Sequence, residues 1–378
     1  MNAPAADFAA LRALCADCLR ETVLPARWEA LAAAGEPALD VAQAQGVTAL
    51  LAAAVAKVLP AYPELTELHA ALSVRNKREA MQEMQRGLIA REAIAALAEG
   101  DVRVLVLKGT ALAHWLYPQP WQRLGCDVDL LVPELAAAET AVDCLQARDF
   151  MLQTSVRPAQ TAGFEAALEK RGRRGFAVDL HWRIANRAQL AKALTFDELW
   201  AASIPLPDLH PAARGLGPLH ALLHALLHRV TNFPTGEHDR LIWLFDIHLL
   251  ARSLDAAQWQ TLLALCARRA IATPCLDGLE ASRLAFATAI PDAALQSLRA
   301  AAAQEHWQLG STLDQAAMDR AHLAALPWRG KLGWLRRKLF PSPEFMRYRY
   351  SISGTSAALV RAYLTRWVTG VVRLFKRG

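Results

Sequence analysis

Two aspartates stand two residues apart at the start of an apolar stretch, in the segment RLGCDVDLLV at 123–132. Alternate side chains of a β-strand share a face, so Asp127 and Asp129 would point the same way, with Cα atoms roughly 6.6 Å apart. Carboxylates are costly to bury unless they are paired or bind a metal ion. Two of them at this spacing can converge on divalent ions held about 3.5–4 Å apart. The pair is therefore a candidate metal site, although Asp127 could also cap a turn after Gly125.

A third acid stands in a second apolar segment, FAVDLHWRI at 176–184. As a strand, this segment would place Asp179 and His181 on one face and apolar side chains on the other. If the two strands are neighbours, Asp179 becomes a third ligand, and His181 is the residue that would support the acids. Oxygen ligands suit Mg²⁺ or Mn²⁺, and Mg²⁺ is usually completed by water and substrate phosphates. The three acids therefore predict phosphoryl or nucleotidyl transfer.

A phosphate site is predicted where the strand at 102–107, VRVLVL, ends. Lys108 lies at this end, directly before the turn at Gly109, and a short helix is expected to begin near Thr110. A lysine and a helix N-terminus are both suited to phosphate. Arg123 is a further phosphate candidate. The alternatives are a solvated turn lysine and a surface arginine.

Three histidines recur every four residues in HALLHALLH, at His220, His224 and His228, on one helix face. The first and last would be about 12 Å apart along the axis, so the three cannot share one ion. Two of them could bind one ion with a ligand from elsewhere, but we expect a structural or substrate-lining role, with Asp246 or Asp239 as the carboxylate partner. His228, closest to the end of the helix, is expected near the active cleft. Arg240 and Asp246 are expected to make interhelical contacts.

The segments that must position these residues follow a helix–sheet–helix order. A strand–helix–strand–helix–strand core is expected between long helical runs, which predicts an α+β protein with a small mixed sheet. The expected organisation is a helical N-terminal region at 1–98, the α/β core at 99–190, a helical bundle at 191–326 and a basic tail at 327–378.

The tail carries most of the positive charge of the chain. The whole chain of 378 residues has a net charge of +6, but 327–378 alone contains twelve Lys or Arg and one acid. Its last segment predicts an amphipathic helix in which arginines interrupt apolar residues. This helix could pack on the bundle, lie on an anionic membrane, or contact a polyanion such as nucleic acid or an anionic glycan.

The cysteines and the apolar runs indicate a cytoplasmic protein. Six cysteines are scattered, the N-terminus lacks the pattern of a secretory signal peptide, and no apolar run is long enough to span a bilayer. The CADC motif at 15–18 has no second Cys/His pair, so it does not predict a metal site. A peripheral position at the inner membrane face is consistent with the basic tail.

The combined motifs resemble a known family. VLVLKGTALAHWLYPQPWQRLGCDVDLLV followed by FAVDLHWRI is similar to the nucleotidyltransferase fold shared with DNA polymerase β, and more closely to largely uncharacterised bacterial nucleotidyltransferase-like proteins. The resemblance covers about 80–250, including RLIWLFDIHLL, and FPSPEFMRYRY fits the family's C-terminal pattern. One departure is the Lys108-Gly109 turn, where the wider superfamily has Gly-Gly or Gly-Ser.

The resemblance implies roles for the acids. Asp127 and Asp129 would bind Mg²⁺ or Mn²⁺, and Asp179 would ligate one ion and orient or deprotonate the attacking hydroxyl. The donor would be an NTP such as ATP, and the acceptor a protein, an RNA or a sugar. The competing hypothesis is a catalytically weak or inactive nucleotide sensor or assembly module, for example in a bacterial polysaccharide pathway. A toxin-neutralising adenylyltransferase is a third.

Overall fold

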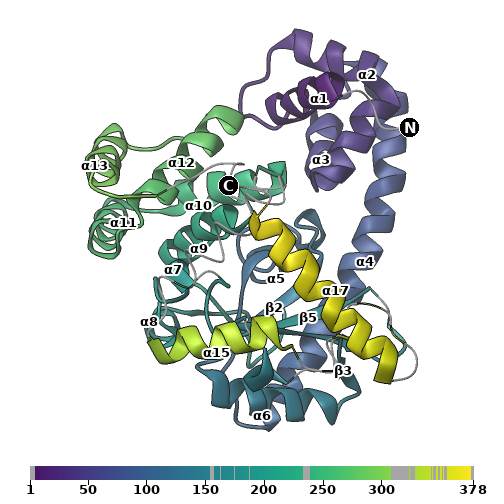
Figure 1. The fold of residues 1–378 in the computed structure, drawn as a ribbon. Helices are drawn as coiled ribbons and strands as arrows, with labels where there is room; N and C mark the ends of the chain where they lie inside the picture. Colours follow the sequence, from purple (N-terminus) through teal and green to yellow (C-terminus); the bar gives the residue numbers. More distant parts are fainter. Residues whose placement is uncertain are drawn as a thin grey trace.

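A central sheet lies between two groups of helices, and a helical hairpin follows at the C-terminal end (Figure 1). The computed structural model describes residues 5–153, 157–161, 163–173, 175–186, 188–232, 239–307 and 328–341, together with 323, 343, 346–347, 350, 352 and 356–375. This arrangement confirms the predicted α+β class, with a mixed sheet between helical regions.

The N-terminal group ends in one long helix that runs along the sheet. The helices are α1 (Ala5–Asp17), α2 (Pro25–Ala44), α3 (Thr48–Val58) and α4 (Thr66–Glu99). Helices α2 and α3 are separated at Gly46, where the chain takes a positive φ of 71°. Helix α4 ends at Glu99, before Gly100, and its C-terminal half packs on the sheet and on α6 (Leu135–Gln146).

The sheet has seven strands in the order β3-β4-β5-β2-β1-β7-β6. The strands are β1 (Leu105–Val106), β2 (Asp127–Leu131), β3 (Phe150–Leu152), β4 (Glu165–Lys170), β5 (Ala177–His181), β6 (Ile204–Pro205) and β7 (Arg214–Gly215). Strand β2 is parallel to β5 and antiparallel to β1. The three predicted strands are therefore β1, β2 and β5, and they lie side by side in the middle of the sheet.

The two faces of the central strands have opposite characters. Val128 and Leu130 of β2 and Val178 and Leu180 of β5 are fully buried in one hydrophobic cluster with residues of α4 and α6. The acids alternate with these residues, so they lie on the opposite face. Burial of the apolar face against α4 and α6 thus fixes which way the acids point.

Helices of the C-terminal half lie on the acidic side of the sheet. The helices after α6 are α7 (Ala188–Ala191), α8 (Phe196–Ala201), α9 (Pro218–Thr231), α10 (Leu241–Ser253), α11 (Ala256–Arg269), α12 (Ala272–Phe286) and α13 (Asp292–Ala302). The short helix α5 (Lys108–Ala113) precedes α6 in the chain. Short 3-10 helices occupy Pro63–Leu65, Pro120–Gln122 and Pro158–Gln160. Helices α9, α10 and α12 share one hydrophobic cluster with α1, α2 and α3.

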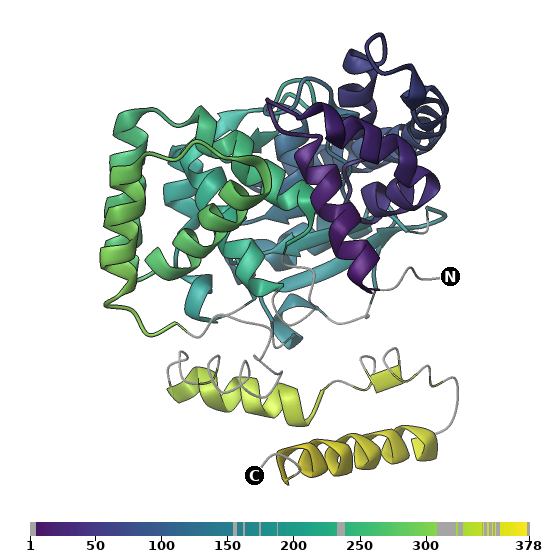
Figure 2. The same cartoon turned by 90° about the horizontal axis from the view of Figure 1, so that it is seen from above.

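The basic tail forms two helices that stand apart from the body in the view from above (Figure 2). They are α15 (Trp328–Leu339) and α17 (Ser356–Phe375), so an amphipathic helix forms where the sequence predicts it. None of the helices among the described residues is long and apolar enough to cross a membrane.

Candidate active site

The register of two parallel strands brings the predicted acids together. Asp129 of β2 lies opposite Asp179 of β5, and Asp127 lies opposite Ala177. The two acids of β2 and the acid of β5 therefore share the sheet face that carries no apolar cluster with α4 and α6. The predicted grouping of the three acids requires that β2 and β5 be neighbours, and the two strands are paired in the sheet.

Asp129 is the centre of the cluster and is only 2% exposed. Its Oδ1 atom accepts a hydrogen bond from Lys108 Nζ at 2.7 Å and lies 2.9 Å from His181 Nε2. His181 Nδ1 in turn lies 3.5 Å from a carboxylate oxygen of Glu165, its register partner on β4. Burial alone would raise the pKa of Asp129, but Lys108 and His181 outweigh it and hold that pKa well below the usual range.

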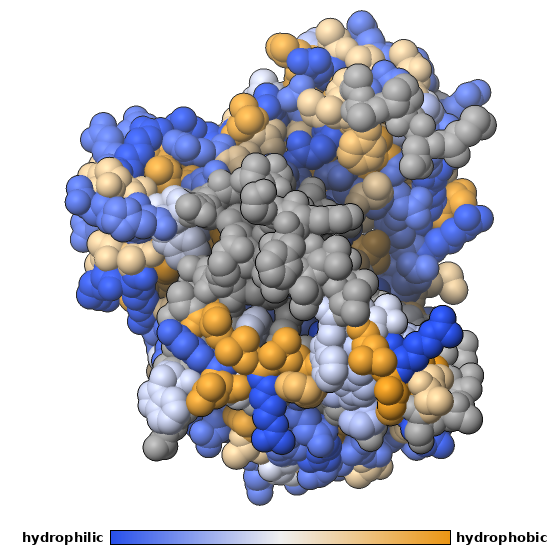
Figure 3. Space-filling model, in the orientation of Figure 1, coloured by the Kyte–Doolittle hydropathy of each residue, from blue (hydrophilic) through white to orange (hydrophobic). Residues whose placement is uncertain are grey.

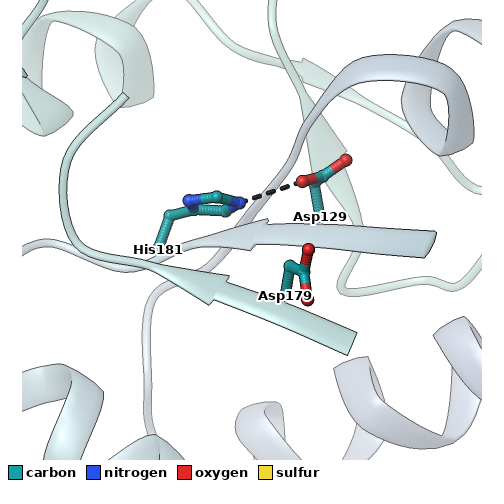
Figure 4. A group of neighbouring side chains, drawn as sticks. All are labelled: Asp129, Asp179 and His181. Carbon is teal, nitrogen blue, oxygen red and sulfur yellow. Dashed lines mark hydrogen bonds and ion pairs between the residues drawn. The ribbon is translucent and has the colours of Figure 1, made fainter. Parts of the chain in front are cut away.

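Three side chains are close enough to hold one metal ion. Asp129, Asp179 and His181 each offer a ligand atom, and these atoms lie within 4.8 Å of one another. Figure 4 shows the two acids on neighbouring strands, with His181 turned toward Asp129. Two carboxylates and an imidazole can bind a divalent cation, with water or substrate oxygens completing the shell.

This group differs in one member from the set that the sequence predicts. His181 belongs to it, although the sequence analysis gave His181 only a supporting role. Asp127 is outside the group, but it lines the same cavity as Asp129 and interacts with it electrostatically. Asp127 thus remains a predicted ligand for a second ion, next to the three-residue group.

The negative charges of the acids repel one another, so the cluster favours the binding of positive charge. Burial, followed by the charges of Asp129 and Asp127, raises the pKa of Asp179 to about 7. Burial and the charge of Asp129 also raise the pKa of Asp127. A bound proton or a bound cation relieves this repulsion, and a divalent cation can relieve it for several carboxylates at once.

The predicted phosphate residues occupy different environments. Lys108 begins α5 with a positive φ of 49°, lines the cavity, and pairs with Asp129. Gly109 also lines the cavity, and a Cβ there would lie 2.8 Å from Arg123 Nη1, which explains a residue without a side chain at this position. Thr110 is buried, and its hydroxyl donates to the Asp127 carbonyl at 3.4 Å. Helix α5 begins two residues earlier than predicted and has only six residues.

Arg123 forms a buried ion pair that the sequence analysis did not anticipate. Its Nε and Nη2 atoms donate to the two oxygens of Asp246 on α10, with a shortest distance of 2.6 Å, and Nη1 donates to the Leu124 carbonyl. Tyr117 donates its hydroxyl to the same carboxylate at 2.7 Å. These contacts hold the segment before β2 against α10. Arg123 therefore positions this segment and also lines the cavity.

The expected contact partners on α10 are thus corrected. Asp246 does not pair with a histidine of α9, because Arg123 and Tyr117 occupy its carboxylate. Arg240 lies over the ring of Trp243, with its guanidinium carbon 5.4 Å from the ring centre, and donates to Cys126 Sγ at 3.9 Å. The RLIWLFD pattern therefore marks a helix that reaches the start of β2 at two points.

A cavity of about 460 Å³ opens beside Asp127 and Asp129, whereas Asp179 is not among its described lining residues. Asp127, Asp129 and His181 line one side, and α9 and α10 provide the opposite wall. His224 and His228 both line that wall, so His228 lies at the cleft, where the sequence predicts it. His220 lies outside the lining and pairs with Glu198 of α8 at 3.3 Å.

The two cavity histidines are neutral at neutral pH. Burial, followed by the charge of Lys108, lowers the pKa of His224 to about 3, and the same two causes lower the pKa of His228 well below its usual value. His224 Nε2 is buried without a hydrogen-bond partner among the described residues. The wall therefore offers an uncharged, unused hydrogen-bonding atom to a ligand in the cavity.

A family model described as an uncharacterised nucleotidyltransferase matches residues 33–287, more than half of the chain. The chain belongs to this family. The match extends beyond the resemblance noted at 80–250, and it includes both acidic strands, α9 and α10. The FPSPEFMRYRY segment lies outside the matched residues, and part of it lies outside the described residues.

Membership in this nucleotidyltransferase family supports a role in nucleotidyl transfer. The family description specifies no donor, acceptor or metal. Searches of curated proteins and of solved structures returned no match to the chain.

Proposed function

We propose that this member of the nucleotidyltransferase family transfers a nucleoside monophosphate from an NTP to a hydroxyl group of an acceptor, with Mg²⁺ or Mn²⁺ as the cofactor. The observation that carries the proposal is the cluster of Asp129, Asp179 and His181, with Asp127 beside it, at the side of a cavity large enough for a small ligand. The DNA polymerase β-type superfamily is the wider group to which we assign the family.

The reaction requires charge neutralisation and accurate positioning more than covalent chemistry. The acceptor oxygen forms a bond to the α-phosphorus, the bond from that phosphorus to the bridging oxygen of the β-phosphate breaks, and pyrophosphate leaves. The divalent cation supplies positive charge to the phosphate oxygens. We assign to Asp179 the role of orienting the hydroxyl or accepting its proton, because it lies opposite Asp129 on the same face of the sheet.

The cationic side chains of the cavity are proposed to hold the phosphates. Lys108 and Gly109 line the cavity next to Asp129. Arg240 also lines it, and its Nε is buried without a hydrogen-bond partner among the described residues. Thr110 and Arg123 were also predicted to bind nucleotide, and their contacts support a positioning role: Thr110 holds the β2 backbone, and Arg123 holds α10.

A catalytically weak nucleotide sensor or assembly module remains the second candidate, and one contact favours it. The Lys108 ammonium occupies a position against Asp129 that a cation would otherwise take. A divalent ion must displace this ammonium or share the carboxylate with it. In that case the unusual Lys108-Gly109 turn would bind a nucleotide without turnover. The proposed ligand is an NTP of the cytoplasm.

The test is transfer of label from α-³²P-labelled NTPs. The protein is incubated with each NTP, Mg²⁺ or Mn²⁺, and a cell lysate as the source of acceptors. Label that is sensitive to protease, ribonuclease or periodate assigns the acceptor to protein, RNA or sugar. We expect pyrophosphate release with the wild-type chain and about a hundredfold less with Asp127→Ala/Asp129→Ala, since a lost charge-stabilising group costs roughly this much.

The matched control is Asp197→Ala, since the Asp197 side chain is 84% exposed and distant from the cavity lining. This variant should keep wild-type activity, and all variants should keep the helical circular dichroism signal. Pyrophosphate release that the double variant retains in full would contradict the metal site. Tight NTP binding without release in the wild-type chain would favour the sensor.

A further inference from the structure

The first helix of the C-terminal hairpin exposes its apolar face. Trp328, Leu332, Leu335 and Leu339 recur at spacings of three and four, so they lie on one side of α15. Trp328 is 66% exposed and Leu332 is 59% exposed, and the other two are also exposed. Trp334, on another side of the helix, is buried. The helix therefore packs through one face and presents a second apolar face to the outside.

The second helix continues the same surface. Val360, Leu364 and Trp367 of α17 are exposed at helical spacing, and Leu364 is 53% exposed. Trp367 donates its indole N–H to the Leu339 carbonyl at 2.7 Å and packs edge-on against Phe340, with ring centres 5.3 Å apart. The end of α15 and the middle of α17 are thus in contact, and their exposed apolar residues form one surface.

Figures 2 and 3 show where this surface lies. The hairpin stands away from the body in the view from above (Figure 2). In the space-filling view, hydrophobic residues gather over α15 and over the coloured part of α17, on the face turned toward the viewer (Figure 3). We refer to Trp328, Leu332, Leu335, Leu339, Phe340, Val360, Leu364 and Trp367 as the hairpin surface. The sequence left open whether this tail packs on the bundle, and the exposed hairpin surface argues against complete packing there.

Positive charge accompanies the hairpin surface. The segment 327–378 has twelve Lys or Arg and one acid. Arg336 and Arg361 are exposed on the two helices, and Lys331 is half-buried on the first. A ligand that fits must therefore be both apolar and anionic over an area that spans two helices.

We propose that the hairpin surface binds the surface of an anionic lipid bilayer, with both helices lying in the plane of the interface. Basic amphipathic helices with Trp, Leu and Phe on the apolar side bind such interfaces through apolar burial and attraction to anionic headgroups. A nucleic acid would satisfy the arginines but would leave exposed leucines in water. Neither helix spans the bilayer, which agrees with the lack of a spanning helix among the described residues.

The location of the hairpin makes this interaction separable from the proposed chemistry. The family model ends at residue 287, and both hairpin helices follow that end. Among the residues that the structure describes, those lining the cavity all lie outside α15 and α17. Membrane binding is thus an addition to the family core, and it does not rest on the proposed nucleotidyl transfer.

The experiment measures sedimentation of the full chain with lipid vesicles. Vesicles of phosphatidylglycerol mixed with phosphatidylcholine are compared with vesicles of phosphatidylcholine alone. We expect binding to the anionic vesicles to exceed binding to the neutral ones by about tenfold and to fall at high salt. The variant Leu332→Glu/Leu364→Glu should lose about tenfold in binding, because it places charge on the apolar face.

Two controls protect the result against misfolding and unrelated effects. Leu284→Glu changes a leucine of α12 that is 80% exposed, and it should bind vesicles as the wild type does. Asp127→Ala/Asp129→Ala should also bind normally, so the failure of one proposal is distinguishable from the failure of the other. Circular dichroism verifies that each variant is folded.

Several outcomes would overturn the proposal. One is a wild-type chain that does not sediment with anionic vesicles, and another is a Leu332→Glu/Leu364→Glu variant that binds as well as the wild type. Sedimentation velocity tests a second copy of the chain: a wild-type dimer that becomes a monomer in the variant, without vesicle binding, assigns the surface to self-association. Binding of RNA but not of vesicles assigns it to nucleic acid.

Discussion

Asp129 and Asp179 differ in charge state because they have different neighbours. Asp129 has Lys108 and His181 within hydrogen-bond distance and stays ionised. Asp179 lies opposite it in register without such a partner among the described residues, and its pKa rises to about 7. Chemically identical carboxylates thus divide into one fixed anion and one group that can exchange a proton near neutral pH.

Metal binding should therefore depend on pH through Asp179. A metal ligand must be deprotonated, so affinity for Mn²⁺ should fall by up to about tenfold for each pH unit below 7 and level off above it. Isothermal titration in two buffers of different ionisation enthalpy measures both the affinity and the proton released. Affinity that stays constant between about pH 5.5 and 7.5 would contradict the assigned role of Asp179.

Without metal, the stability of the folded chain should change with pH in the opposite direction to the metal affinity. The pKa of Asp179 is higher in the folded chain than the ordinary value of 3.8, so the folded state binds the proton more tightly than the unfolded state. The stabilisation from this proton is fully present below about pH 3.8 and is lost as the pH rises through 7. Added Mn²⁺ should restore stability at the upper end of this window, which thermal unfolding would reveal.

At the scale of elements, the site depends on how α10 is fastened to the strand that carries two of the acids. The Arg123–Asp246 pair joins them, and both side chains are only 5% exposed. Tyr117 adds a third group to the pair through its hydroxyl. The same helix carries Trp243 and follows Arg240, both of which line the cavity, so a displaced α10 would open the cavity wall.

Asp246→Asn should consequently destabilise the chain by about 3–5 kcal/mol, because it leaves the Arg123 guanidinium buried without its anion. Urea unfolding measures the loss. The exposed pair of Arg103 and Asp197, 3.4 Å apart, provides the control, and Asp197→Asn should change stability by less than about 1 kcal/mol. Replacing both partners, as in Arg123→Met/Asp246→Leu, should recover much of the loss. Equal effects of the two single variants would show that the buried pair has no special role.

At the scale of the whole molecule, the N-terminal helices and the helices from α9 to α12 share one hydrophobic core. Leu31 and Leu51 of the N-terminal helices belong to the same hydrophobic cluster as Leu222 of α9 and Leu250 of α10. Gln45 also accepts hydrogen bonds from the backbone N–H groups that begin α10, and Arg20 donates to carbonyls at the end of α12. The predicted boundaries at 98 and 190 describe the order of segments along the chain. The packing joins the region before the first boundary to the helices that follow the second.

The shared core predicts that the N-terminal helices and the helices from α9 to α12 unfold together. Differential scanning calorimetry should give one transition for this part of the chain. Gln45→Ala should lower its midpoint without splitting it, because the variant removes a buried hydrogen bond to α10 but leaves the cluster intact. Two separate transitions in the wild-type chain would instead indicate independent domains.

The missed strand β4 illustrates a limit of sequence patterns. Its sequence, EAALEK, consists of residues with little strand preference. The segment is a strand because β3 and β5 pair with it on both sides. Pairing partners, rather than local propensity, decide such cases.

The sequence alone determined the features that are periodic or local. Alternation of acids and apolar residues assigned one face of β2 and of β5, and the helical runs and the amphipathic tail were recognisable by their spacing. Tertiary structure decided which distant side chains meet. His181 reaches Asp129 across 52 residues, and Arg123 reaches Asp246 across 123. Local preference acts over a few residues, whereas these contacts depend on which strands and helices become neighbours in the folded chain.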